Sequence, residues 1–426
     1  MIPFILLPIS IFLVIFVPFS ALFTSAIGIF FDKKNAKIYL LLFVMVISLP
    51  ILRYSPAFGD DSSWHYFAAS EFSKFGSFGE LMSSLDSGNG YIGRYNYSEI
   101  PVFTYLMYLF SDTFTYSLIS FVVCIITYYC YTLPAVDYYQ KNRVFIRYFL
   151  FAILAIFLLN NYRYTTSGMR YCLSSSITMM LIYFDSKAKK SIGRQTLFFL
   201  LYAIPLLIHP AVIYFIFIRF LYPFIKTVKW CWSLAFFLAF PLLIFLIPYV
   251  ADISGIELLK MYSSKIEIYI NNDSYEELFT FTLMTRMYIG VLVILLYLFL
   301  FLFFRNAINS INYKMFLSLT FYFSLFSLGT VFTRNVFDRN LFILYPMIVL
   351  SVTFLVMYIS GVVNNVNNRN VLYFIVGIIY FLCILIGFFY NKNFPLEYID
   401  YSISELFIKN IFDYFSNLPR FYINTN

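Results

Sequence analysis

The segment FTLMTRMYIGVLVILLYLFLFLFF, residues 281–304, contains a single charged side chain, Arg286. A helix of about 20 mainly apolar residues spans a bilayer, because it satisfies its own backbone hydrogen bonds in lipid. Similar runs recur along the 426-residue chain, which is 62% hydrophobic and only 12% charged. Soluble domains carry about 25% charged residues. The composition therefore excludes a soluble enzyme, a disordered protein and a nucleic-acid-binding protein that uses a basic face. It predicts an all-α polytopic membrane protein.

The apolar runs predict about 12 transmembrane helices. Residues 99–111 are apolar but too short to cross, and we expect an interfacial or re-entrant helix there. His209-Pro210 divides residues 195–225 into two spans, because a single span would place one of its two basic flanks on the outer side. The predicted spans are 3–31, 37–52, 113–133, 144–161, 168–184, 195–209, 210–225, 230–250, 281–304, 314–331, 341–361 and 370–390.

Lysine and arginine set the predicted orientation. When alternate loops are assigned to one side, that side holds 16 of the 29 basic residues but only three of the 21 acidic residues, Asp32, Asp137 and Asp185. Cytoplasmic loops carry such an excess, so this side is the inner one and both termini are predicted to lie outside. The expected organisation is one transmembrane domain, 1–426. It has an outer loop with an interfacial helix at 53–112, an outer loop at 251–280 and an outer C-terminal tail at 391–426.

The five cysteines lie in apolar stretches and form neither a CxxC pair nor a Cys/His cluster of metal-ligand spacing. We interpret them as small apolar residues, and we predict no disulfide framework and no metal site. The cysteines are Cys124, Cys130, Cys172, Cys231 and Cys383.

Several arginines are predicted at the outer ends of spans, against the charge bias. An arginine at the apolar boundary is costly and usually faces a partner, a cavity or a ligand. The planar guanidinium suits bidentate pairing with phosphate oxygens. We therefore interpret the outer arginines as candidate anion-binding residues and the inner lysines as determinants of topology. The candidates are Arg53, Arg94, Arg163, Arg170, Arg286, Arg334 and Arg339.

Each of these arginines also has a structural interpretation. Arg170 would extend to the outer headgroups if it bound no ligand. Arg53 would fix its loop by pairing with Asp60 or Asp61. Arg334 and Arg339 flank Asp338 in the sequence, which favours an internal ion pair.

Asp60, Asp61 and His209 are the candidate catalytic groups, because a carboxylate or an imidazole can accept a proton from a hydroxyl. The alternative for the aspartates is a turn and helix N-cap ahead of residues 62–75, a common role for Asp. The alternative for His209 is a polar residue that closes a helix before Pro210. His65 follows Trp64, and we expect it to pack at the membrane interface.

Two motifs carry a resemblance to a known family. Arg53 closes the second span, and Gly59-Asp60-Asp61 with the nearby Tyr66 follows it. Further on, Gly-Met-Arg-Tyr at residues 168–171 opens a span, and Leu-Ile-His-Pro-Ala at residues 207–211 ends a later apolar run. In these features the first half of the chain resembles the EpsG-like group of Wzy-type bacterial O-antigen and exopolysaccharide polymerases. It departs from the family pattern at residues 61–65, where Asp-Ser-Ser-Trp-His stands in place of Asp, a small residue and Tyr.

The resemblance implies a GT-C-like membrane glycosyltransferase in the bacterial inner membrane, with its active face outward. Such a polymerase joins a polyprenyl-diphosphate-linked glycan donor to a second lipid-linked repeat unit, without a metal or cofactor. The expected partners are this donor and acceptor, membrane lipids and a chain-length regulator protein, and no nucleic acid. A carboxylate or histidine would deprotonate the acceptor hydroxyl, while arginines would stabilise the departing lipid diphosphate.

Other functions stay open. A lipid-linked oligosaccharide flippase also has about 12 spans, but such a transporter commonly shows repeat symmetry, and no halves of this chain match. An O-antigen ligase uses similar chemistry with a different acceptor. A membrane O-acyltransferase would be expected to carry a histidine in an early span, and the first two predicted spans contain none.

Overall fold

The structure is a computed structural model of the chain. It describes residues 2–54, 61–88, 90–93, 95–111, 117–142, 146–160, 165–166, 168–187, 191–227, 230–239, 247–254, 281–309, 311, 313–331, 333–362, 366–392 and 408–416. Within these ranges the chain is helical apart from turns and one two-stranded hairpin, as predicted for an all-α membrane protein. Five of the described helices are long and apolar enough to cross a membrane. They cover Ala36–Arg53, Ser117–Asn142, Met284–Phe303, Val336–Ser360 and Val366–Phe388.

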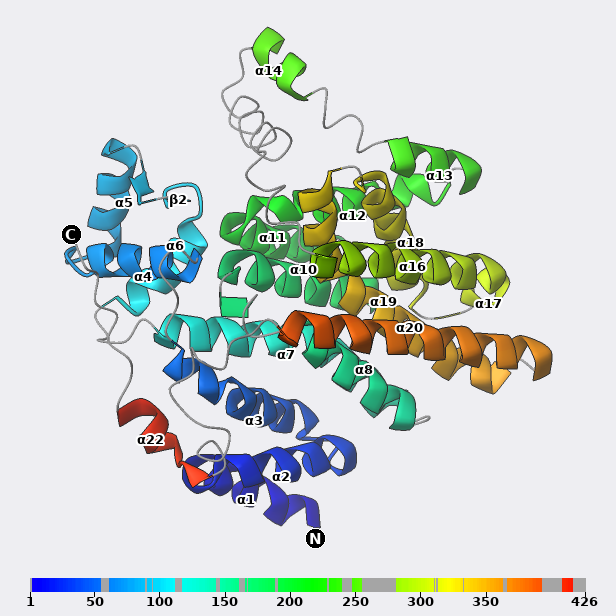
Figure 1. Cartoon of the computed structure of the whole chain (residues 1–426), viewed down its shortest axis with the longest axis horizontal. Coiled ribbons are helices and arrows are strands. Elements are labelled where there is room, and N and C mark those ends of the chain that lie inside the picture. Colours follow the sequence, from blue (N-terminus) through cyan, green and yellow to red (C-terminus); the bar gives the residue numbers. More distant parts are fainter. Residues whose placement is uncertain are drawn as a thin grey trace.

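The elements follow one another along the chain as shown in Figure 1. In order they are α1 (Ile2–Phe16), α2 (Pro18–Phe31), α3 (Ala36–Ser48), η1 (Leu49–Arg53), α4 (Asp61–Phe72), α5 (Phe78–Ser87), β1 (Tyr91–Ile92), β2 (Tyr95–Asn96), α6 (Pro101–Leu109), α7 (Ser117–Asn142), α8 (Ile146–Leu159), α10 (Met169–Lys187), α11 (Ile192–Ile208), η2 (Pro210–Val212), α12 (Ile213–Ile225), α13 (Trp230–Ala239), α14 (Ile247–Ser254), α16 (Phe281–Phe303), α17 (Arg305–Ile308), α18 (Lys314–Gly329), α19 (Arg334–Val362), α20 (Val366–Lys392) and α22 (Ile411–Ser416).

The first apolar run forms two helices, so the prediction of a single span over residues 3–31 is wrong. Pro18 favours a new helix start, and the chain changes direction at Val17, which has φ −143° and ψ 69°. α1 and α2 lie side by side (Figure 1). Val14 and Ala21, on either side of the turn, share one cluster with Leu49 at the end of α3. The prediction of an outer N-terminus assumed that single span. In the hairpin, the start of α1 lies at the same end of the bundle as the start of α3 (Figure 1).

The division at His209-Pro210 is confirmed. α11 ends at Ile208, His209 lies in the turn, and η2 leads into α12. The rings of Phe199 and Phe220 lie 5.5 Å apart across the two helices. The predicted span at 230–250 is described only in part, as α13 and the start of α14.

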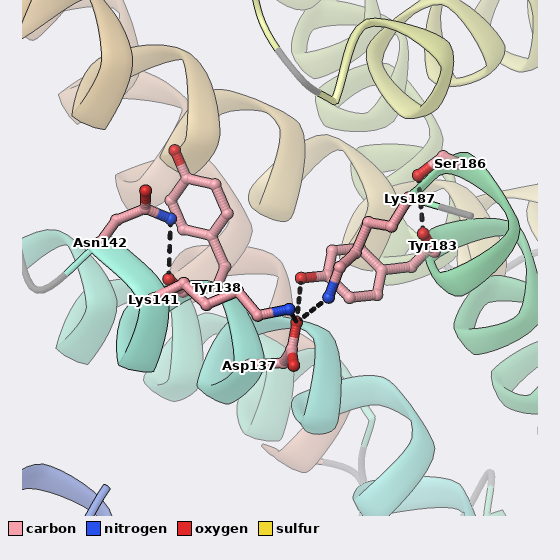
Figure 2. A network of polar contacts seen from close by, with 7 residues as sticks. All are labelled: Asp137, Tyr138, Lys141, Asn142, Tyr183, Ser186 and Lys187. Carbon is pink, nitrogen blue, oxygen red and sulfur yellow. Dashed lines mark hydrogen bonds and ion pairs between the residues drawn. The ribbon is translucent and has the colours of Figure 1, made fainter. Parts of the chain in front are cut away.

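Two buried carboxylates tie helices together at the end of the bundle predicted to face inward. Asp137 of α7 accepts hydrogen bonds from Lys141, Lys187 and Tyr183 (Figure 2). Asp185 of α10 accepts from the Arg219 Nε at 2.6 Å and from the Tyr202 hydroxyl at 3.2 Å. Such pairs are costly to break, because the remaining charge is left buried.

The predicted span 168–184 is α10, a polar helix in the interior of the bundle. It packs against α7, α11, α18 and α19. Three of its buried hydroxyls donate to backbone carbonyls: Ser174 to Pro205 at 2.7 Å, Ser176 to Leu173 at 2.9 Å and Thr178 to Ser174 at 2.8 Å. Because these polar groups are paired inside the protein, α10 does not need a lipid-facing surface.

The outer segment predicted at 53–112 folds into α4, α5, the β1–β2 hairpin and α6, and α6 is the short helix expected at 99–111. Phe72, Leu81 and Phe103 form its core together with residues of α7 and α10, including Ile119 and Leu173. The segment is therefore docked on the bundle. Of the loop predicted at 251–280, residues 255–280 lie outside the described residues. From the tail predicted at 391–426, α22 packs against η1 and α1.

Candidate functional site

The β1–β2 hairpin positions Tyr95. Tyr91 pairs with Asn96 and Ile92 pairs with Tyr95. Gly93 follows β1 with φ +61°, a conformation that favours glycine. A Cβ at Gly93 would lie 2.8 Å from the Trp64 ring of α4. The glycine thus allows the hairpin to sit directly on α4 and brings Tyr95 beside the first residues of that helix.

Tyr95 joins the candidate carboxylate to the candidate arginine. Its hydroxyl donates to Oδ1 of Asp61 at 2.5 Å. The Cζ atom of Arg170 lies 4.1 Å from the centroid of the Tyr95 ring, which is within the range of a cation–π contact. The ring of His65 stacks on Tyr95 at 5.0 Å with an interplanar angle of 25°. α4, the hairpin and α10 therefore converge on one tyrosine.

His65 is a core residue of the outer segment. It is 1% exposed, and its Nδ1 atom lies 2.9 Å from the Tyr97 hydroxyl. Burial and the nearby Arg170 charge lower the pKa of His65 well below its ordinary value. Burial also raises the pKa of the Tyr97 phenol. Both groups are neutral at physiological pH, and the expectation that His65 packs at the membrane interface is wrong.

Arg170 differs from Arg219 and Arg286 in what balances its charge. Within the described residues no carboxylate pairs with Arg170, and its guanidinium lies over the Tyr95 ring. By contrast, Arg219 pairs with Asp185, and Arg286 pairs with Asp338. A guanidinium without an acidic partner keeps its N–H donors available for an anionic ligand.

Tyr171, the next residue of α10, contacts two other candidate residues, Arg339 and His209. Its hydroxyl donates to the backbone carbonyl of Arg339 at 2.6 Å. Its ring meets the His209 ring at 5.4 Å and 76°. The Nδ1 atom of His209 accepts the N–H of Ala211 at 3.1 Å. His209 therefore closes the turn before η2, the structural role considered from the sequence, and it also touches Tyr171.

The remaining predicted site residues are Asp60 and five arginines, Arg53, Arg94, Arg163, Arg286 and Arg334. Arg286 is 5% exposed and forms an ion pair with Asp338 across α16 and α19. Arg53 is 7% exposed at the end of η1, which packs on α7. Arg334 begins α19. Arg94, Arg163 and Asp60, and the side chain of Arg334, lie outside the described residues.

The structure therefore links Asp61 to Arg170 through Tyr95, and His209 to Arg339 through Tyr171. Sequence reasoning did not assign a role to either tyrosine. The available signal was position: Tyr95 follows a glycine that favours a turn, and Tyr171 follows Arg170 directly.

The described part of the chain contains no group of three His, Cys, Asp or Glu residues that would hold a metal ion. Four described cysteines, Cys124, Cys130, Cys172 and Cys383, are buried, and no disulfide joins them. The chain matches no family model, no curated protein and no solved structure.

Proposed function

We propose that the chain polymerises polyprenyl-diphosphate-linked oligosaccharide repeat units into a surface polysaccharide. The reaction would take place on the outer face of the bacterial inner membrane. The observation that carries the proposal is Arg170, a half-buried guanidinium that has no acidic partner among the described residues and lies next to a carboxylate site. By contrast, Arg219 and Arg286 each form an ion pair with an aspartate, which accounts for their charge within the fold.

Glycosyl transfer from a lipid diphosphate requires an anion-binding group and a proton acceptor that lie close together. In the proposed step, the acceptor hydroxyl oxygen bonds to the anomeric carbon of the donor. The bond from that carbon to the lipid diphosphate breaks, and the hydroxyl proton passes to a base. Arg170 would stabilise the charge that develops on the diphosphate. Asp61 would accept the proton once its oxygen is within hydrogen-bond reach of the hydroxyl.

The neutral neighbours support this division of roles. His65 is buried and its pKa is lowered, so its neutral ring does not repel the Arg170 charge. It supports the Tyr95 ring from α4. Tyr97 holds the His65 ring through its hydroxyl.

The deciding experiment is deletion of the gene in its native host, followed by gel separation of the surface polysaccharide. The proposal expects loss of the long-chain ladder while a single capped repeat unit is retained, and recovery when the gene is restored. Complete loss of capped repeats would instead favour a flippase or a ligase. An unchanged ladder would contradict a role in this polysaccharide.

A further inference from the structure

Tyr95 contacts both Arg170 and Asp61. Its ring lies under the Arg170 guanidinium at 4.1 Å, and its hydroxyl occupies Oδ1 of Asp61 at 2.5 Å. In this arrangement the arginine is held by an aromatic face, and one oxygen of the carboxylate already accepts a hydrogen bond.

The contact with Arg170 is replaceable. A cation–π contact is weaker than the charge-assisted, two-pronged pairing of a guanidinium with a phosphate group. A diphosphate at this site would therefore draw Arg170 away from the Tyr95 ring. Tyr95 would then lose one of the contacts that hold it over Asp61.

The hairpin is short. β1 and β2 are each two residues long, and Tyr91 is 60% exposed. Ile92 and Tyr95 pack against the core of the segment. Gly93 also lies against Trp64, and Tyr95 contacts Asp61, His65 and Arg170. Loss of the Arg170 contact removes one of the links between the hairpin and α10.

We propose that Tyr95 is a positioning residue that couples diphosphate binding to release of the Asp61 carboxylate. Without ligand, Tyr95 holds Arg170 and covers Asp61. A lipid diphosphate then pairs with Arg170, and Tyr95 moves away from Asp61. The Asp61 carboxylate becomes available to the acceptor hydroxyl. The Oδ1 atom of the carboxylate is thereby released only when a donor is bound. This inference rests on the proposed function for its meaning, but the movement itself is measured separately.

Trp64 provides the readout, because its ring lies against Gly93, two residues before Tyr95. The chain has three tryptophans, Trp64, Trp230 and Trp232. In the full-length protein with Trp230→Phe and Trp232→Phe, emission reports Trp64 alone. The probe is geranylgeranyl diphosphate in detergent without divalent metal, compared with geranylgeraniol and with inorganic pyrophosphate.

The coupling predicts a saturable change in Trp64 emission with geranylgeranyl diphosphate and none with geranylgeraniol. A change with pyrophosphate alone would show that the phosphates suffice and that the lipid is not needed for release. Arg170→Gln should abolish the response, and Arg170→Lys should weaken it. Normal elution in gel filtration would establish that both variants are folded.

Tyr95→Phe separates coupling from simple ligand contact. This variant keeps the ring but loses the bond to Asp61, so the covered state is less stable and the probe should bind roughly 5- to 10-fold more tightly. Tyr91→Phe, in the same hairpin, is the matched control and should bind as the parent protein does. Weaker binding by Tyr95→Phe, or a full response in Arg170→Gln, would overturn the inference.

The two proposals fail in different ways. Loss of the polysaccharide ladder on gene deletion, together with unchanged Trp64 emission, would support the polymerase and refute the coupling. A change in Trp64 emission together with an unchanged ladder would support a Tyr95 that responds to diphosphate and refute the polymerase.

Discussion

Asp137 of α7 and Lys187, the last residue of α10, form a buried ion pair at the end of the bundle opposite Arg170 (Figure 2). Their side chains are 8% and 18% exposed. The Tyr183 hydroxyl donates to the same carboxylate oxygen at 2.7 Å. This pair fixes the C-terminal end of α10, whose N-terminal end carries Arg170 and Tyr171.

Replacement of Asp137 by Ala should destabilise the fold strongly. It leaves the half-buried Lys187 without its carboxylate partner, and the expected loss is about 3–5 kcal/mol. The measurement is thermal unfolding of the detergent-solubilised protein. Lys141→Ala is the matched control: Lys141 contacts the same carboxylate, but its side chain is 49% exposed. Its removal should cost at most about 1 kcal/mol. Equal losses for both variants would show that the Asp137–Lys187 pair is not the important contact.

Gly93→Ala should displace the hairpin. The residue has φ +61°, and the added methyl group would meet the Trp64 ring. Such a left-handed conformation costs a non-glycine residue about 1–2 kcal/mol before any clash. We expect faster limited proteolysis within residues 88–97 and a shortened polysaccharide ladder. Gly193→Ala is the control, because nothing lies within 4 Å of that position in α11. Unchanged proteolysis of Gly93→Ala would contradict the proposed packing of the hairpin on α4.

His65 should make stability depend on pH. Its pKa in the folded protein is lowered by burial and by Arg170, so the folded state binds fewer protons than the unfolded state. This difference has no effect above the unfolded value of about 6.5, and stability is lost as the pH falls below it. The melting temperature between pH 7.5 and 5 should fall less in His65→Gln than in the parent protein. A parental slope in His65→Gln would contradict a neutral His65.

The α1–α2 hairpin predicts the side on which the chain begins. The turn at Val17 lies beside Leu49, directly after the C-terminal end of α3, so the N-terminus should share a side with Lys33 and Lys34, which is predicted to be the inner one. An N-terminal fluorescent protein that folds only in the cytoplasm should fluoresce, and alkaline phosphatase fused at the same place should be inactive. The opposite pair of results would restore the single span.

The amino-acid sequence predicts the helical class and most helix positions because both follow from apolar runs and charge bias. The His209-Pro210 turn and the short helix at 99–111 were predictable in the same way. The turn at Val17 was not, because an uncharged, uniformly apolar segment fits one long helix and a hairpin equally well. The polarity of α10 also gave no sign of its central place, since burial of its hydroxyls depends on packing by other helices.

The candidate site shows the same limit. Arg170 stood out because a membrane arginine is costly, and the structure leaves it without an acidic partner among the described residues. Arg286 satisfied the same criterion, yet its charge is balanced by Asp338, 52 residues later in the sequence. Tyr95 and Asp61 are 34 residues apart. Contacts at such separations depend on how the hairpin and the helices dock, and residue type alone does not reveal them.

The most direct test of the central claim is the chain-length distribution of the surface polysaccharide in a deletion strain that carries Arg170→Gln. Membrane levels of the variant are matched to the parent protein, and Arg194→Gln on the exposed start of α11 serves as the control. The account predicts single capped repeat units with Arg170→Gln and a full ladder with Arg194→Gln. A full ladder with Arg170→Gln would contradict the assignment of this guanidinium to the lipid diphosphate.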